Sequence, residues 1–147
     1  MPGQFSYRLM YPGDGEALLK LVAASPDTGL IGFSYQYMAD PITVHTTFEP
    51  GLQGAVALHS GQVVGMVFGE ATSVQWAGKI YPAAYLSNLR VLPAFRQQGV
   101  AKGFANWGFP YISEILGPDV ILYGAAMHGN FSRVLGEKQG FVSTHSI

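Results

Sequence analysis

The chain has 147 residues, of which 48% are hydrophobic and only 12% charged, with a net charge of −1 and no cysteine. This length suits one domain with a sizeable core, and the near-zero charge argues against a nucleic-acid-binding protein, which needs a basic face to neutralise phosphates. The absence of cysteine excludes a disulfide scaffold, a thiolate metal site and a cysteine nucleophile.

The first third of the chain predicts a strand, a helix and a second strand, in that order. Residues 5–10 have the length and aromatic content of a strand. Asp14 can cap the helix that follows, and Ser25-Pro26 ends it because proline disfavours helical geometry in the residue before it. Residues 42–48 are rich in β-branched side chains and predict a strand.

A β-hairpin is predicted in the middle of the chain. Two apolar runs, residues 55–59 and 62–70, flank the turn signal Ser60-Gly61. Residues 71–81, which include a tryptophan and a glycine, are predicted to form a loop.

The second half predicts alternating strands and helices. Residues 84–92 predict a strand, and a helix begins at Gly99, with a kink or break expected near Pro110. Residues 120–126 form a continuous apolar run typical of a buried strand, and a helix is predicted over 130–138. Strands mixed with helices around a central hairpin predict an α/β or α+β fold, with helices packed on a sheet.

Residues 85–104 combine several features of an anion-binding site. A strand leads through a short turn into a helix, whose N-terminus offers unpaired N–H groups and the positive end of its dipole. Gly99 and Ala101 permit close approach, and Arg96 and Lys102 add positive charge. The segment therefore predicts a phosphate or pyrophosphate site. The alternative is a strand-to-helix junction that exists for packing alone.

The pattern L-x-V-x-P-x-x-R-x-x-G-x-A over residues 89–101 resembles the acyl-CoA signature of the GNAT superfamily of N-acyltransferases. The order of the predicted elements from residue 7 to residue 141 resembles that family as well. The resemblance implies a mixed, mostly antiparallel central sheet flanked by helices, with a splayed strand at the acyl-CoA site. It also implies an N-acetyltransferase, in which a primary amine of a small molecule or peptide attacks the thioester of acetyl-CoA directly.

The resemblance implies a role for each part of the motif. The backbone of Leu89, Arg90 and Val91 would bind the pantetheine arm, and the N–H of Val91 would stabilise charge on the thioester carbonyl. Asn130 would hydrogen-bond the same arm or would only cap the helix that it opens. The residues implied to hold the pyrophosphate are Arg96, Gln97, Gln98, Gly99, Val100, Ala101 and Lys102.

Two side chains that many members of the family use for proton transfer are replaced. Tyr85 stands in place of a glutamate base, and Gly136 in place of a tyrosine acid. Tyr85 and His128 are the candidate catalytic residues, and Glu70 could act as a base through water. The alternatives are purely structural roles. Tyr85 would be an aromatic residue of a strand, His128 a loop histidine, and Glu70 a solvated residue at the end of a strand.

Two groups of aromatic residues carry further predictions. The first lies where the family builds its acceptor-binding wall and predicts an apolar or aromatic acceptor pocket; it comprises Phe33, Tyr35, Tyr37 and Met38. The second lies along the helix from Gly99 and is either core or a partner surface; it comprises Phe104, Trp107, Tyr111 and Ile115.

Location, partners and domain organisation complete the predictions. The sequence has neither a signal peptide nor about 18 consecutive apolar residues, which predicts a cytoplasmic protein without a membrane partner. His45, His59 and His145 show no metal-ligand spacing, so no metal is assigned. Residues 1–147 are predicted to form one domain. Its low charge and the absence of an expected last strand favour a homodimer or a downstream domain that covers part of the surface.

Two alternatives to an active enzyme stay open at this point. One is a non-catalytic acyl-CoA-binding or regulatory domain, motivated by Tyr85 and Gly136 at the usual base and acid positions. The other is the cofactor-binding part of a larger tandem-domain protein.

Overall fold

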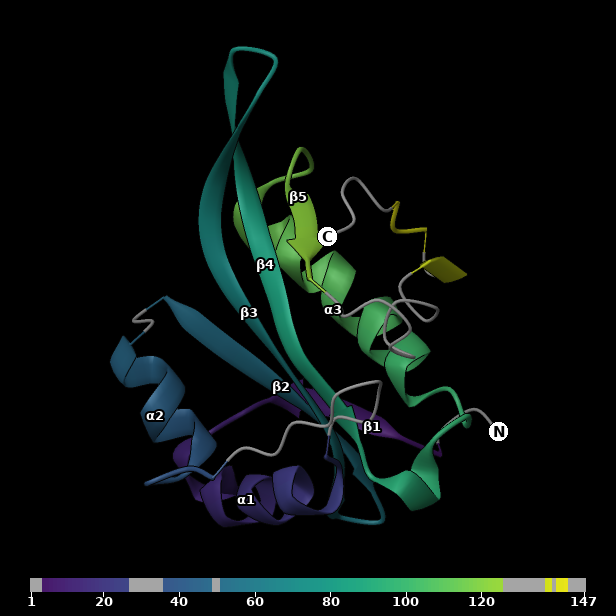
Figure 1. Ribbon diagram of the computed structural model, residues 1–147. Coiled ribbons are helices and arrows are strands. Elements are labelled where there is room, and N and C mark those ends of the chain that lie inside the picture. Colours follow the sequence, from purple (N-terminus) through teal and green to yellow (C-terminus); the bar gives the residue numbers. More distant parts are fainter. Residues whose placement is uncertain (1–3, 27–35, 49–50, 126–136, 139, 143–147) are drawn as a thin grey trace.

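A five-stranded sheet in the order β1-β2-β3-β4-β5 forms the centre of the protein (Figure 1). The structure is a computed structural model that describes residues 4–26, 36–48, 51–125, 137–138 and 140–142. Neighbouring strands are antiparallel except β5, which is parallel to β4. The strands are β1 (Ser6–Leu9), β2 (Leu52–His59), β3 (Gln62–Trp76), β4 (Lys79–Val91) and β5 (Ile121–Gly124). The predicted mixed, mostly antiparallel sheet is confirmed.

Helices cover both faces of this sheet (Figure 1). On one face, called here the α1–α2 face, lie α1 (Gly15–Ala24) and α2 (Pro41–Phe48); on the other, the α3 face, lies α3 (Val100–Leu116). The core of the α1–α2 face comprises Leu18, Leu21, Val22, Leu52, Val56, Met66 and Phe68. The core of the α3 face comprises Ala55, Ala57, Val64, Val100 and Phe104. Side chains that alternate along β2 and β3 therefore contribute to an apolar core on each face of the sheet.

The predicted hairpin at Ser60-Gly61 is confirmed. Both residues have positive φ, +48° and +79°, as a two-residue turn with the twist of its strands requires. A second turn of the same kind, Ala77-Gly78 with φ of +49° and +77°, joins β3 to β4. The prediction of a loop over residues 71–81 is therefore wrong.

Residues 71–76 instead pair with residues 79–84, visible in Figure 1 as the long hairpin of β3 and β4. Residues 72–76 alternate apolar or β-branched side chains with polar ones, which is the strand period. Trp76 and Ile80 are 70% and 76% exposed near the tip of the hairpin. That a partner or a further domain covers part of the surface stays a prediction.

The strand predicted over residues 42–48 is wrong, because this segment forms α2. Asp40 caps the helix by accepting the Thr43 N–H at 3.0 Å and the Thr43 hydroxyl at 2.6 Å. Pro41 occupies the first helical position, where its missing N–H costs nothing. Thr46 and Thr47 donate their hydroxyls to carbonyls of their own helix. These local hydrogen bonds outweigh the β propensity of the side chains.

Asp40→Ala should lower the free energy of unfolding by about 1 kcal/mol, the usual cost of a lost N-terminal cap. Hydrogen bonds from the Thr43 side chain and backbone lower the pKa of Asp40. The stabilisation is therefore complete above the ordinary carboxyl pKa of about 4 and disappears as pH falls through the folded value. Urea unfolding at pH 7 and pH 3 measures it. Asp119→Ala, at an exposed turn aspartate, is the control and should change little.

The remaining elements differ in detail from the predictions. α3 continues through Pro110 as one helix and ends before Gly117, which has a φ of +98°. β5 coincides with the strand predicted over 120–126, but its residues are half-buried or exposed because it is the edge strand of the described sheet. Most of the helix predicted over 130–138 lies outside the described residues. No helix in the described part of the chain is long and apolar enough to cross a membrane.

Candidate functional site

β4 and β5 separate just before the predicted acyl-CoA motif of residues 89–101. Their pairing runs from Ala83↔Ile121 to Leu86↔Gly124, while β4 continues through residues 87–91. No strand among the described residues pairs with this continuation on the β5 side. The register between β3 and β4 shifts in the same stretch, with Asn88 at φ +54°. Such a bulge twists a strand and redirects its side chains, so β4 has an open edge from residue 87 onward.

The backbone of Val91 faces this open edge. The Leu92 N–H donates to the Val64 carbonyl at 2.9 Å, toward β3. Successive residues of a paired strand direct their N–H and C=O groups to opposite edges, so Val91 directs its groups away from β3. Its carbonyl accepts the Arg96 Nε–H at 3.1 Å.

Leu89 and Arg90, the other two residues predicted to bind the pantetheine arm, direct their side chains to opposite faces of the sheet. Leu89 packs against the core of the α3 face. Arg90 is 6% exposed, and its guanidinium donates to the Ser25 carbonyl at 2.6 Å. The Arg90 side chain therefore ties β4 to the end of α1, and only its backbone is left for the predicted contact with a ligand.

The loop before α3 forms an open cradle. Gln97 and Gly99 have φ of +60° and +86°, and a Cβ added at Gly99 would meet nothing within 4 Å. The first bond within the helix is Gly103 N–H to the Gly99 carbonyl, at 2.9 Å. The N–H groups before it belong to Val100, Ala101 and Lys102 and have no acceptor inside the helix. The side chains of Arg96 and Lys102 are exposed.

Side-chain hydrogen bonds of Gln98 and Gln4 stabilise the conformation of this loop. The Gln98 amide donates to the Ala94 carbonyl and accepts from the Gln4 amide, both at 2.9 Å. Gln98 is thus committed to the loop itself, which leaves backbone N–H groups and two cations as the donors to an anion.

Tyr7 and two glycines fix the N-terminus of α3 against the sheet. The Tyr7 hydroxyl donates to the Val100 carbonyl at 3.0 Å, and burial raises the pKa of Tyr7. A Cβ at Gly103 would overlap the Tyr7 ring, and one at Gly65 would lie 3.0 Å from Val100. The lack of a side chain at Gly103 therefore permits the close approach of α3 to β1.

Two of the three candidate proton-transfer residues, Glu70 and Tyr85, lie on the α1–α2 face. Glu70 of β3, Tyr85 of β4 and Tyr123 of β5 are paired across the sheet and share one face. This is the face of Phe68, two residues before Glu70. The Tyr85 and Tyr123 rings are 5.1 Å apart. Sequence reasoning missed Tyr123, which no motif marks.

The predicted acceptor wall is described only in part. The Tyr37 hydroxyl lies 2.9 Å from Nε2 of His45 in α2, and the His45 ring packs on Phe68 with centroids 4.7 Å apart. Met38 is fully exposed. The remaining predicted residues outside the described ranges are Phe33, Tyr35, His128, Asn130, Gly136 and His145. In the described part, no cluster of His, Asp and Glu could hold a metal ion.

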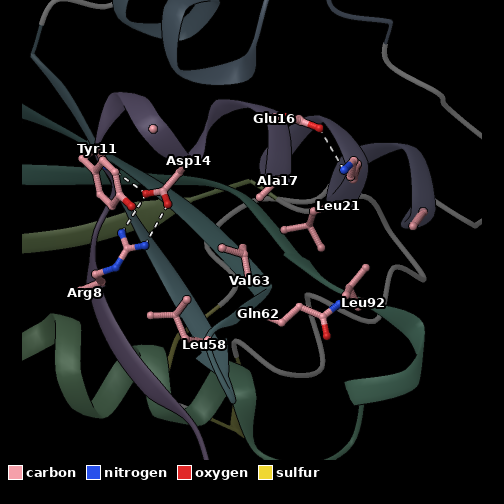
Figure 2. Close-up of a pocket in the computed structure, with 14 residues that line it drawn as sticks. Arg8, Tyr11, Asp14, Glu16, Ala17, Leu21, Leu58, Gln62, Val63 and Leu92 are labelled. Carbon is pink, nitrogen blue, oxygen red and sulfur yellow. Dashed lines mark hydrogen bonds and ion pairs between the residues drawn. The ribbon is translucent and has the colours of Figure 1, made fainter.

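A separate hollow of about 620 Å³ lies beside α1 (Figure 2). Its charged residues pair with one another: Arg8 with Asp14 at 2.8 Å and Glu16 with Lys20 at 3.0 Å. Asp14 was predicted to cap α1 but makes no cap bond, because its carboxylate accepts from Arg8 and from the Tyr11 N–H. The hollow therefore offers a ligand no unpaired charge.

Comparison with known proteins rests on structure. No family model and no curated protein sequence matches the chain. A transcriptional regulator from Bacillus halodurans C-125 is 18% identical, with a TM-score of 0.74 over 97% of this chain and 96% of that one. AAC(6′)-Iy, solved with the bisubstrate analogue CoA-S-monomethyl-acetylneamine, is 19% identical, with a TM-score of 0.73 over 97% and 94%.

A ribosomal-protein-alanine N-acetyltransferase from Brucella melitensis biovar Abortus 2308 is 16% identical, with a TM-score of 0.70 over 97% of this chain and 95% of that one. Identities this low establish a common fold and nothing finer. The similarity extends over nearly the whole length of each structure. The fold implied by the motif over residues 89–101 is confirmed: the chain has the fold of the GNAT acetyltransferases.

Proposed function

We propose that this protein is an acetyl-CoA-dependent N-acetyltransferase acting on a primary amine of a small molecule or peptide. The observation that carries the proposal is the open edge of β4 at residues 87–91, followed directly by the cradle at the N-terminus of α3. Structures of the same fold include the aminoglycoside N-acetyltransferase AAC(6′)-Iy in complex with CoA and the ribosomal-protein-alanine N-acetyltransferase. They support acetyl transfer to an amine in general.

The residues of the cradle fit the phosphates of acetyl-CoA. The space at Gly99 admits a phosphate close to the backbone, and the free N–H groups at the start of α3 are anion donors. Arg96 and Lys102 add positive charge. The open edge of β4 would bind the pantetheine arm through backbone hydrogen bonds, and acetyl-CoA would supply the acetyl group as a thioester.

The reaction needs stabilisation of negative charge and removal of a proton. The N–H of Val91, directed to the open edge, would stabilise the charge that develops on the carbonyl oxygen. Tyr85 and Glu70 lie on the α1–α2 face, where they could orient the amine. His128 as a proton-transfer residue and Asn130 as a pantetheine ligand remain predictions.

Ligand-dependent stability and thiol release together test the proposal. Acetyl-CoA at 100 times its Kd should raise the free energy of unfolding by about 2.7 kcal/mol and the Tm accordingly. With a panel of aminoglycosides, arylalkylamines and peptides, at least one amine should release free thiol above the rate of background hydrolysis. Binding without turnover would favour the non-catalytic alternative, and no binding would contradict both.

A further inference from the structure

We propose that Tyr37 and His45 form a proton relay that accepts the proton of the amine substrate. The inference rests on the proposed acetyl transfer and names its proton acceptor. It would answer the replacement of the usual glutamate base by Tyr85, because a phenol hydroxyl is a poor proton acceptor at neutral pH.

The relay lies on the α1–α2 face, over the strand that neighbours the open edge of β4. The Tyr37 hydroxyl is 2.9 Å from His45 Nε2, within hydrogen-bond distance. The His45 ring packs on Phe68, and Phe68 is paired across the sheet with Ser87. Ser87 is the first residue of β4 beyond the last pair with β5. The Tyr37–His45 pair therefore lies on the α1–α2 face over β3, the strand next to the start of the open edge of β4.

The chemistry calls for a base with a pKa near neutrality. An alkylamine is largely protonated at pH 7, since its pKa is about 10, and only the neutral amine can attack a carbonyl carbon. Imidazole, with an ordinary pKa of about 6.5, is the side chain suited to accept this proton. A hydrogen bond to Tyr37 orients the ring, and the packing on Phe68 holds it in place.

The proton balance is simple. The ammonium passes one proton to the Tyr37 oxygen while the hydroxyl proton of Tyr37 moves to His45 Nε2, so tyrosine is regenerated and imidazole becomes imidazolium. The neutral amine then forms the C–N bond as the C–S bond breaks. Its second proton goes to the departing sulfur, and His45 releases its own proton to water.

Other titratable groups near His45 are few in the described structure. From β3 and β4, Glu70 and Tyr85 lie one paired row further along the same face. Asp40 is occupied in capping α2, and Glu16 of α1 pairs with Lys20. Glu70 is therefore the main rival for the role of base.

The pH dependence of acetylation by His45→Gln and Tyr37→Phe tests the relay, with acetyl-CoA and the best amine of the panel. Both should lower kcat at pH 7, His45→Gln by about 100-fold. The deficit should shrink as pH approaches the pKa of the amine. The KM for acetyl-CoA and its thermal shift should stay unchanged. Thr46→Val is the matched control, because its exposed hydroxyl bonds only to its own helix, and it should behave as wild type.

Several outcomes would overturn the relay. A loss in His45→Gln that is equal at every pH would indicate a structural role. A pH-dependent loss in Glu70→Gln but not in His45→Gln would make Glu70 the base. An unaltered rate in His45→Gln, with an amine that reacts, removes the relay but leaves the proposed acetyl transfer intact. If acetyl-CoA binds and no amine reacts, the acetyl transfer and the relay both fail.

Discussion

Gly99→Glu is expected to abolish measurable acetyl-CoA binding while the chain still folds. Gly99 precedes α3 at φ +86°, with open space where its side chain would begin. A carboxylate there would share the cradle with the pyrophosphate. Two like charges about 4 Å apart at an effective dielectric constant of about 20 repel by about 4 kcal/mol, which is about a thousandfold in Kd. Calorimetric titration with acetyl-CoA measures the loss.

Two further variants separate charge from strain and bulk. Gly78→Glu introduces the same side chain at the β3–β4 turn, also at positive φ, +77°, and also with nothing within 4 Å. It should lose about as much stability as Gly99→Glu, about 1–2 kcal/mol for a left-handed residue, and keep its affinity. Gly99→Gln keeps the bulk without the charge and should bind more tightly than Gly99→Glu. Unchanged affinity in Gly99→Glu would mean that residues 96–102 do not hold the phosphates.

Local signals predicted most of the fold. The turn at Ser60-Gly61 and the strand-to-helix junction at Gly99 are each encoded within a few residues, and both are found as predicted. The two segments whose secondary structure was predicted wrongly have one cause in common. In α2 and in the β3–β4 hairpin, a short hydrogen-bonding signal decided the structure: the cap at Asp40 and the turn at Ala77-Gly78. Residue composition averaged over the segment concealed both signals.

The candidate site likewise contains one part that is encoded locally and one that depends on tertiary packing. The proposed phosphate cradle lies in one contiguous stretch, so the motif over residues 89–101 and the helix start at Gly99 were enough to predict it. The candidate residues of the α1–α2 face do not, because Tyr37, Glu70 and Tyr85 come to the same face only through the packing of α2 and the register of β3 on β4. That register includes a bulge whose position no sequence pattern marked. Arg90 differs from both. It is a charged residue inside the motif, but its side chain stabilises the fold by donating a hydrogen bond to the Ser25 carbonyl.

Asp14→Asn is expected to lower the free energy of unfolding by about 2 kcal/mol at pH 7, less than for a fully buried ion pair because the Arg8 side chain is 35% exposed. The Asp14 carboxylate is 4% exposed and accepts both terminal nitrogens of Arg8 at 2.8 Å and the Tyr11 N–H at 3.0 Å (Figure 2). An asparagine of the same size cannot accept all three bonds, and it leaves the guanidinium without its counter-charge.

Glu16→Gln is the matched control, since it also removes one negative charge near the start of α1. Its partner Lys20 lies 3.0 Å away, but the two side chains are 81% and 76% exposed. An exposed pair of this spacing contributes about 0.5 kcal/mol or less. The contribution of the helix dipole is similar in both variants, so the difference between them measures the burial of the Arg8–Asp14 pair.

The pH dependence of the Asp14→Asn effect identifies its source. Burial alone would raise the pKa of Asp14, but the hydrogen bonds from Arg8 and the Tyr11 N–H outweigh it, and the pKa is lowered. A carboxyl whose pKa is lower in the folded state stabilises fully above its unfolded value, about 3.9, and loses this as pH falls through the folded value. Urea unfolding should therefore show the gap between wild type and Asp14→Asn narrowing from pH 7 to pH 3. A gap of constant size, or an equal loss in Glu16→Gln, would show that the ion pair is not its cause.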